Sequence, residues 1–222
     1  MHGQDVTDPY RWLETSESLK VMRWLAVQQA IFADHRARWS MLAEMRSRIT
    51  AALTDDVWSP PKVRGERIFA TQRIANAEHP RLVVIRAGVV RVLLDLPAVD
   101  IEGTTTLDRW DPSPLGQVIA VQTSRRGTER SGLAVIDATS GEVVDGPISG
   151  LRYSPIAWLD DATFYYVRKA NVWLHRLGTP TADDRLVVAP SAGRSVMLDV
   201  RIYQGRWLIA EHSHGTGQRR DV

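Results

Sequence analysis

The sequence predicts a mainly β protein with a helical segment at its N-terminus. Residues 1–58 carry apolar side chains at helical spacing, whereas from about residue 66 onward short runs rich in Val, Ile, Tyr and Trp alternate with turn residues. Many short strands separated by turns about every 8–12 residues are typical of a sandwich, barrel or propeller. A weak internal repeat, described below, favours the propeller. We therefore expect a helical extension over residues 1–58 and an incomplete β-propeller over residues 59–222.

Two helices are expected in the N-terminal segment. Ser18 is a suitable N-cap for the first, because its hydroxyl can accept a hydrogen bond from a free backbone N–H of the first turn. The apolar face of this helix consists of Met22, Leu25, Ala26, Phe32 and Ala33. The second helix is expected over residues 41–53, with a stripe formed by Met41, Met45, Ile49 and Leu53. Ser59-Pro60-Pro61 then ends the helical pattern.

The remaining chain reads as strands joined by hairpin-type turns. The expected strands are Arg67–Arg73, Arg81–Arg86, Val89–Leu94, Val118–Gln122, Leu133–Asp137, Phe164–Arg168, Val172–Leu177, Arg185–Ala189, Val196–Tyr203 and Trp207–Glu211. Ala87-Gly88, Ser140-Gly141 and Gln204-Gly205 have the composition of hairpin turns.

The internal repeat is a turn that leads into a strand. It occurs after Trp110 and again after Trp158, about 48 residues later, and a third copy surrounds Gly205. A period of about 40–50 residues with four strands in each unit is typical of a propeller blade. A sandwich with coincidental turn spacing is the alternative that periodicity alone leaves open.

Composition excludes several classes of function. The formal net charge is +2, and no basic run is interleaved with aromatic residues, which argues against nucleic-acid binding. The chain has no Cys, so disulfides, thiolate metal sites and a Cys nucleophile are excluded. No stretch approaches the ~18 apolar residues of a membrane span, and the N-terminus lacks the apolar core of a signal peptide. We expect a cytoplasmic protein without membrane contact.

Short blocks throughout the chain resemble one known family. The most specific is Asp8-Pro9-Tyr10-Arg11-Trp12-Leu13-Glu14, which is followed by a capped helix. Further blocks, in the same order as in the family, are Ser59-Pro60-Pro61-Lys62, Arg64-Gly65, Arg67-Ile68-Phe69, Trp110 with Ser113-Pro114 and Gly116, Asp137–Glu142, Leu177-Gly178-Thr179-Pro180, Leu186-Val187 and, in part, His214-Gly215-Thr216. Leu115 stands where the family usually has Asp. Together these blocks resemble the N-terminal part of the prolyl oligopeptidase family of serine peptidases.

The resemblance implies a fold, an activity and a partner. In this family an N-terminal helical extension packs on a C-terminal α/β-hydrolase domain, and a seven-bladed propeller covers the active site and filters substrates by size. The usual reaction is hydrolysis of short peptides after proline, without a cofactor. Tyr10-Arg11-Trp12 is more similar to the prolyl branch than to the oligopeptidase B branch. In the segment Arg152-Tyr153-Ser154, Tyr153 matches a family position that projects towards substrate; an ordinary strand or core aromatic is the alternative.

No catalytic residue can be assigned. A serine peptidase of this type needs a G-x-S-x-G elbow followed by Asp and His, and the nearest match, Gly193-Arg194-Ser195-Val196-Met197, lacks the second Gly. His212 and His214 lack an evident third metal ligand, so no metal site is expected. The pairs Asp55-Asp56, Asp160-Asp161 and Asp183-Asp184 fit turns and loops, where Asp forms local hydrogen bonds.

Three hypotheses follow. The first is a truncated family member with about three to four blades that is inactive alone because the catalytic domain is absent. The second is a non-catalytic binding or regulatory module that pairs with a separate hydrolase-domain chain or with itself. The third is an unrelated β protein with a helical cap.

Overall fold

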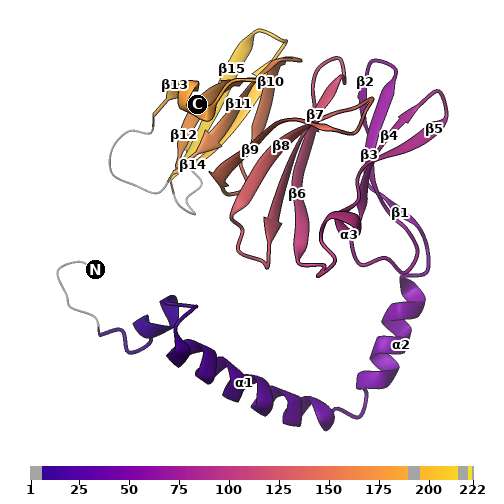
Figure 1. Ribbon diagram of the computed structural model, residues 1–222, viewed down its shortest axis with the longest axis vertical. Coiled ribbons are helices and arrows are strands. Elements are labelled where there is room, and N and C mark those ends of the chain that lie inside the picture. The colour runs from indigo at the N-terminus through magenta and orange to yellow at the C-terminus, as the bar shows by residue number, and fades with distance from the viewer. Residues whose placement is uncertain (1–6, 190–195, 215–219, 222) are drawn as a thin grey trace. The chain divides into compact units, whose positions relative to one another are not determined.

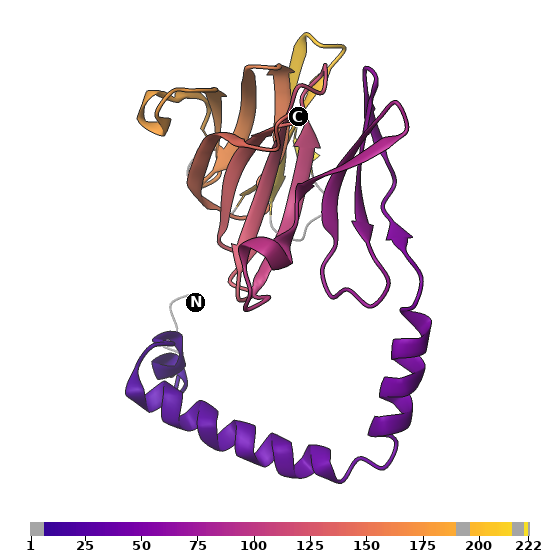
Figure 2. The ribbon, with the colours of Figure 1, turned by 45° about the vertical axis from the view of Figure 1, so that its right-hand side comes forward.

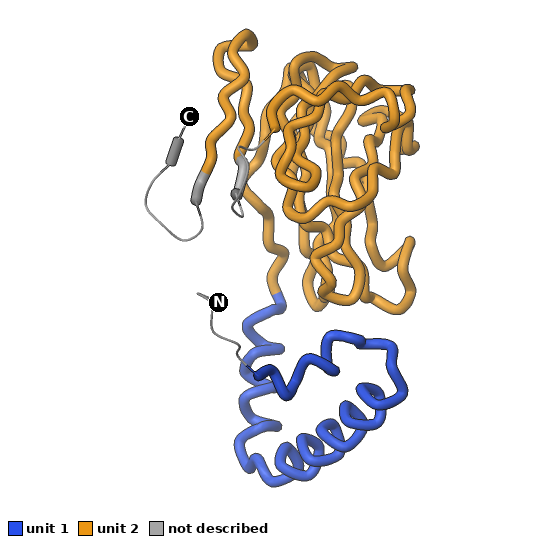
Figure 3. The backbone as a smooth tube through the Cα atoms, turned by 90° about the vertical axis from the view of Figure 1, so that its left-hand side faces the viewer, with its two compact units in different colours: residues 1–54 blue, residues 55–222 orange. Residues whose placement is uncertain are grey.

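The computed structural model describes residues 7–189, 196–214 and 220–221. The chain divides into two compact units, residues 1–54 and residues 55–222 (Figure 3). The first unit is helical and the second consists of antiparallel sheets, which agrees with the predicted fold class. Among the described residues, no helix combines the length and apolar character that crossing a membrane requires.

The first unit contains a short 3-10 helix and two α-helices. They are η1 (Arg11–Glu14), α1 (Leu19–Ala37) and α2 (Leu42–Ala52). The Ser18 hydroxyl accepts a hydrogen bond from the backbone N–H of Val21 at 3.3 Å, which confirms the predicted N-cap. Trp12 of η1 meets Trp24 of α1 edge-to-face, with ring centroids 6.1 Å apart, and Lys20 lies over the Trp12 ring. This contact between two aromatic rings joins the opening segment to α1.

The second unit contains four described antiparallel sheets (Figures 1 and 2). Sheet 1 consists of β1 (Val57–Trp58), β2 (Lys62–Arg64), β3 (Arg67–Arg73), β4 (Arg81–Arg86) and β5 (Val89–Leu94). Sheet 2 consists of β6 (Thr105–Pro112), β7 (Val118–Arg125), β8 (Ser131–Asp137) and β9 (Val143–Leu151). Sheet 3 consists of β10 (Ile156–Asp160), β11 (Thr163–Arg168), β12 (Asn171–Arg176) and β13 (Arg185–Val188). Sheet 4 consists of β14 (Val196–Tyr203), β15 (Trp207–His214) and β16 (Arg220–Asp221), and short helices α3 (Leu96–Val99) and η2 (Thr181–Asp183) lie in connections.

Each predicted strand is present, but several observed strands were not predicted. Among the missed strands, β6 contains Asp and Arg and ends at Pro112, and β9 contains two Gly and a Pro. Such residues are depleted in strands, so propensity works against both predictions. Irregular pairing accommodates them, since the register between β8 and β9 shifts at several points.

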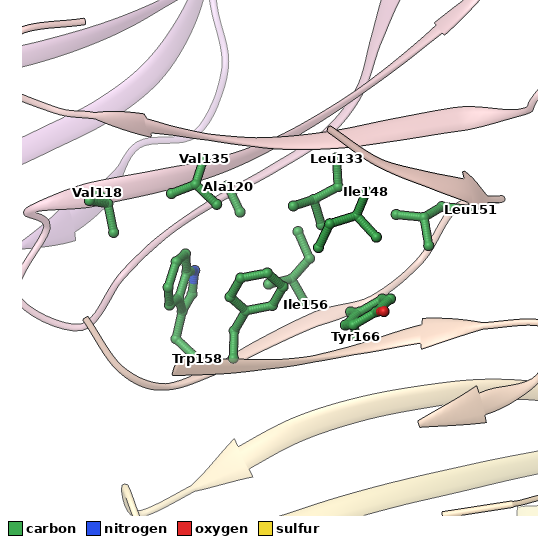
Figure 4. Close-up of a cluster of buried hydrophobic side chains, with 10 residues drawn as sticks. Val118, Ala120, Leu133, Val135, Ile148, Leu151, Ile156, Trp158 and Tyr166 are labelled. Carbon is green, nitrogen blue, oxygen red and sulfur yellow. The ribbon is translucent and has the colours of Figure 1, made fainter. Parts of the chain in front are cut away.

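The main core lies between sheets 2 and 3 (Figure 4). Sheet 2 contributes aliphatic side chains such as Leu133 and Ile148, and sheet 3 contributes Trp158, Phe164 and Tyr166. The rings of Trp158 and Phe164 lie 4.9 Å apart between centroids. Two further clusters join sheet 1 to sheet 2 and sheet 3 to sheet 4. Each sheet therefore buries its apolar face against the next one along the chain.

The predicted repeat corresponds to the turn between the first two strands of sheets 2, 3 and 4. In sheet 2 the Ser113 hydroxyl donates to the Asp161 carboxylate of the equivalent turn in sheet 3, and the Leu115 N–H donates to the same carboxylate at 3.1 Å. The Trp158 indole N–H donates to the Asp111 carbonyl at 3.0 Å. These bonds connect one repeat to the next, so the recurring residues hold neighbouring sheets in place.

Candidate functional site

Tyr153 lies in the short connection between β9 and β10, where the chain passes from sheet 2 to sheet 3. Its backbone adopts a left-handed conformation with φ of 46°, and 53% of the residue is exposed. A side chain in this position is neither a strand residue nor a core residue. The ring is presented to solvent at the junction of two sheets.

A buried glutamine fixes the backbone that carries Tyr153. The Gln122 side chain, fully buried in β7, donates to the Ser154 carbonyl at 2.6 Å and accepts from the Ser154 N–H at 3.1 Å. The Ser154 hydroxyl in turn accepts from the Val167 N–H at 2.8 Å. Because these partners belong to sheets 2 and 3, the connection is held from both sides.

The Tyr153 side chain belongs to a small polar cluster on the surface, which we call the Tyr153 cluster (Glu129, Arg152 and Tyr153). The Tyr153 hydroxyl donates to Glu129 Oε1 at 3.1 Å, and Arg152 forms an ion pair with Glu129 Oε2. Hydrogen bonds from Arg152 and then from Tyr153 hold the pKa of the Glu129 carboxyl below its usual value. The hydrogen bond to Glu129 raises the pKa of the Tyr153 phenol.

The Tyr153 cluster presents an aromatic ring and an ion pair at the surface. At neutral pH the phenol is neutral and its proton is directed to a carboxylate, so Tyr153 offers an aromatic ring rather than an acid or a base. A half-exposed ring with a fixed hydroxyl provides apolar contact area at a low entropic cost. The cluster contains no nucleophile.

Two residues of this arrangement, Gln122 and Glu129, were not predicted from the sequence. Glu129 lies within a charged turn and Gln122 lies in a predicted strand, so each has an unremarkable local setting. Glu129 is 24 residues from Tyr153, and Gln122 is 32 residues from Ser154. Strand pairing brings together residues that are this far apart in sequence, so no local pattern indicates that they are in contact.

Several of the other residues considered in the sequence have structural partners, and others lie outside the described residues. Asp56 accepts from the Gln72 amide at 3.0 Å and from the Ala75 N–H at 2.9 Å, and Asp160 accepts from the Ala162 N–H at 2.8 Å. Ser195 lies outside the described residues, as does the side chain of His214, and His212 lies in β15 opposite Leu198. In the part of the chain that the structure describes, no group of three His, Asp or Glu residues is arranged to hold a metal ion.

Asp184 follows η2 in a loop, yet it is buried in a network with His175 and Tyr166. The His175 Nδ1 atom lies 2.6 Å from Asp184 Oδ1, and its Nε2 atom lies 3.3 Å from Asp145 Oδ1. The Tyr166 hydroxyl donates to Asp184 Oδ2 at 2.5 Å, and burial followed by this hydrogen bond raises the pKa of the phenol. The network joins β9 of sheet 2 to β12 of sheet 3, so its evident role is to hold the two sheets together.

Comparison with known proteins identifies the family to which this architecture belongs. Residues 1–220 match the family model of the prolyl oligopeptidase N-terminal β-propeller domain. The chain belongs to the prolyl oligopeptidase family. The resemblance and the propeller-type fold predicted from the sequence are thereby confirmed.

Individual relatives agree with the family assignment. The chain is 24% identical over 204 residues to a prolyl endopeptidase of Elizabethkingia meningoseptica, covering 84% of this chain and 29% of the relative. A solved prolyl endopeptidase structure matches with a TM-score of 0.83 and 25% identity over 99% of this chain and 37% of that one. Prolyl oligopeptidase B of Galerina marginata, at 17% identity, matches in fold with a TM-score of 0.81, covering 97% of this chain and 34% of that one. The chain therefore spans about a third of the length of its prolyl oligopeptidase relatives.

Proposed function

We propose that these residues form the helical segment and part of the propeller of a prolyl oligopeptidase-type serine peptidase, and that they do not cleave peptides by themselves. The reaction would be hydrolysis of short peptides after proline, performed on a separate α/β-hydrolase domain. The observation that carries the proposal is a family match over residues 1–220 in a sequence that lacks a G-x-S-x-G elbow. Acyl transfer without the nucleophile of a triad is slower by orders of magnitude.

The direct test is hydrolysis of a fluorogenic Gly-Pro peptide. We expect no cleavage above background by the purified 222-residue chain. Adding a catalytic domain of a prolyl oligopeptidase as a second chain should give activity if the two associate. Cleavage by the isolated chain that survives repurification would overturn the proposal.

Within the complete enzyme, we assign Tyr153 to the peptide-binding surface. Its exposed ring, its rigid connection and its fixed hydroxyl support this role. Tyr153→Ala should raise KM for a proline-containing peptide while leaving kcat nearly unchanged, and Tyr153→Phe should retain most of the affinity, because it keeps the ring. Unchanged KM in Tyr153→Ala would exclude the role.

A second candidate function is a non-catalytic module that pairs with a hydrolase-domain chain or with itself. Exposed apolar side chains on α1 and α2 favour it, among them Leu25 at 43%, Ile31 at 49% and Ile49 at 59% exposure. Apolar side chains exposed to this extent are available to a partner surface. Size-exclusion chromatography of the chain with and without an added hydrolase domain distinguishes the possibilities. A monomer that unfolds cooperatively and does not bind the added hydrolase domain would argue against a pairing module.

A further inference from the structure

Four arginines gather on one face of sheet 1. Strand register places Arg64, Arg67 and Arg86 as successive direct neighbours across β2, β3 and β4. Arg91 of β5 pairs with Val84, which lies two residues from Arg86 and therefore on the same face. Like charges directly opposite one another destabilise a sheet, so this arrangement destabilises sheet 1 unless carboxylates neutralise part of the charge.

Nearby carboxylates neutralise only part of the positive charge of these four arginines. Arg86 pairs with Glu66 at 3.1 Å. Asp137 lies close enough to Arg67 for this charge to contribute to its lowered pKa, after the larger contribution of the hydrogen bond from the Ser140 backbone. Two carboxylates therefore face four guanidinium groups, and the surface keeps a positive surplus.

Three of these arginines line a pocket of 150 Å³ between sheet 1 and the turn that joins β8 to β9. Arg67 donates to the Thr139 hydroxyl at 3.0 Å, and Arg91 donates to the Ser140 carbonyl at 2.7 Å. These bonds hold two guanidinium groups at the wall of the pocket. Each of the two arginines, like Arg86, uses one terminal nitrogen in the hydrogen bonds of the described residues. A guanidinium has five N–H donors, so several remain for a ligand.

We propose that this pocket binds a single phosphate group, either free orthophosphate or the phosphate of a small monoester. Planar guanidinium groups recognise the oxygens of a phosphate through paired, charge-assisted hydrogen bonds. The volume suits one phosphate group, and the organic part of a monoester would lie outside the pocket. The residues that line the site lie between Arg67 and Thr139, and the site does not depend on peptidase activity.

The test is isothermal titration calorimetry of the 222-residue chain with sodium phosphate and with phenyl phosphate, at constant ionic strength. Arg86→Gln and Arg91→Gln should each weaken binding about tenfold, the loss expected for a charged hydrogen-bond donor. The matched control is Arg126→Gln, because Arg126 forms a comparable exposed pair with Glu102 at 3.2 Å. This variant should bind as the unaltered chain does.

The outcomes distinguish the two sources of phosphate, and they distinguish a specific site from diffuse positive charge. Binding of both ligands supports a site for the phosphate group itself, and binding of one alone supports the site and identifies its source. Circular dichroism of each variant establishes that the fold is retained. The proposal would be overturned if neither ligand binds. It would also be overturned if Arg126→Gln weakens binding equally, since equal weakening would reflect diffuse charge alone.

Discussion

The phenylalanine side chains differ in burial between the helical unit and the sheets. Phe32 of α1 is 52% exposed, whereas Phe164 of β11 is fully buried between sheets 2 and 3. The helices are specified locally, by a cap and by apolar spacing, but side chains of their apolar stripes are exposed. Each sheet instead buries its apolar face against the sheet of the next repeat. The comparison teaches that the sheets supply one another's packing partners, whereas the helices keep large apolar side chains exposed.

The largest expected effect separates the two phenylalanines. Phe164→Ala should reduce the free energy of unfolding by about 3–5 kcal/mol, because it leaves a cavity in the core. Phe32→Ala should cost less than about 1 kcal/mol, because the side chain is already half in water. Urea denaturation of both variants measures the difference. Equal losses would mean that the helical unit packs as tightly as the sheets.

The next effect tests the joint between sheets 2 and 3. His175→Gln should cost about 3 kcal/mol, because it leaves the buried carboxylate of Asp184 with one partner fewer. The control is His79→Gln, since His79 is partly exposed and contacts the Gly103 carbonyl at 3.0 Å. If the two variants unfold at the same urea concentration, the network does not hold the sheets together.

A smaller effect concerns the support of Tyr153. Gln122→Met keeps the side-chain volume but removes both hydrogen bonds to Ser154, so we expect a loss of about 1–3 kcal/mol. Hydrogen exchange of the Ser154 amide should accelerate. Gln117→Met, at an exposed position of the preceding turn, serves as the control. Unchanged exchange at Ser154 would show that the connection is rigid without Gln122.

The N-cap of α1 tests how far local interactions stabilise the helical unit. Ser18→Ala removes the hydrogen bond to the Val21 N–H and should cost about 0.5–1 kcal/mol of helix stability. Circular dichroism should show reduced helix content. Ser18→Asp, which keeps an acceptor, should restore it. An unaffected helix content in Ser18→Ala would indicate that packing rather than the cap stabilises α1.

The smallest effect is a pH dependence in the Tyr153 cluster. The pKa of Glu129 is lowered, so its interaction is present above the ordinary value of 4.5 and is lost as the pH falls through the lowered value. The pKa of Tyr153 is raised, so the same hydrogen bond is lost as the pH rises through the raised value. Glu129→Gln should therefore return the Tyr153 pKa towards 10.0, as NMR titration of the tyrosine ring would measure. Glu66→Gln should leave it unchanged, and an unshifted Tyr153 in Glu129→Gln would exclude the pairing.

The accuracy of the sequence predictions varied with how local each signal was. Strands rich in Val and Ile, such as β4 and β7, were predicted because their composition suits a buried sheet. Strand β9 was missed because Gly and Pro oppose strand formation, and pairing with β8 and burial of Ile148 in the core stabilise it. Tyr153 was identified by resemblance, whereas its exposure and its bond to Glu129 depend on how two turns meet in space.

The sequence by itself determined the helices, the repeated turn and the family, because capping, hydrophobic spacing and short motifs act over a few residues. Tertiary structure alone decided which side chains meet. Gln122 reaches Ser154, His175 reaches Asp145, and the arginines of sheet 1 line one pocket, all through strand pairing and the stacking of sheets. Burial and charge of those groups depend on neighbours that are distant in sequence, so no local pattern could have revealed them.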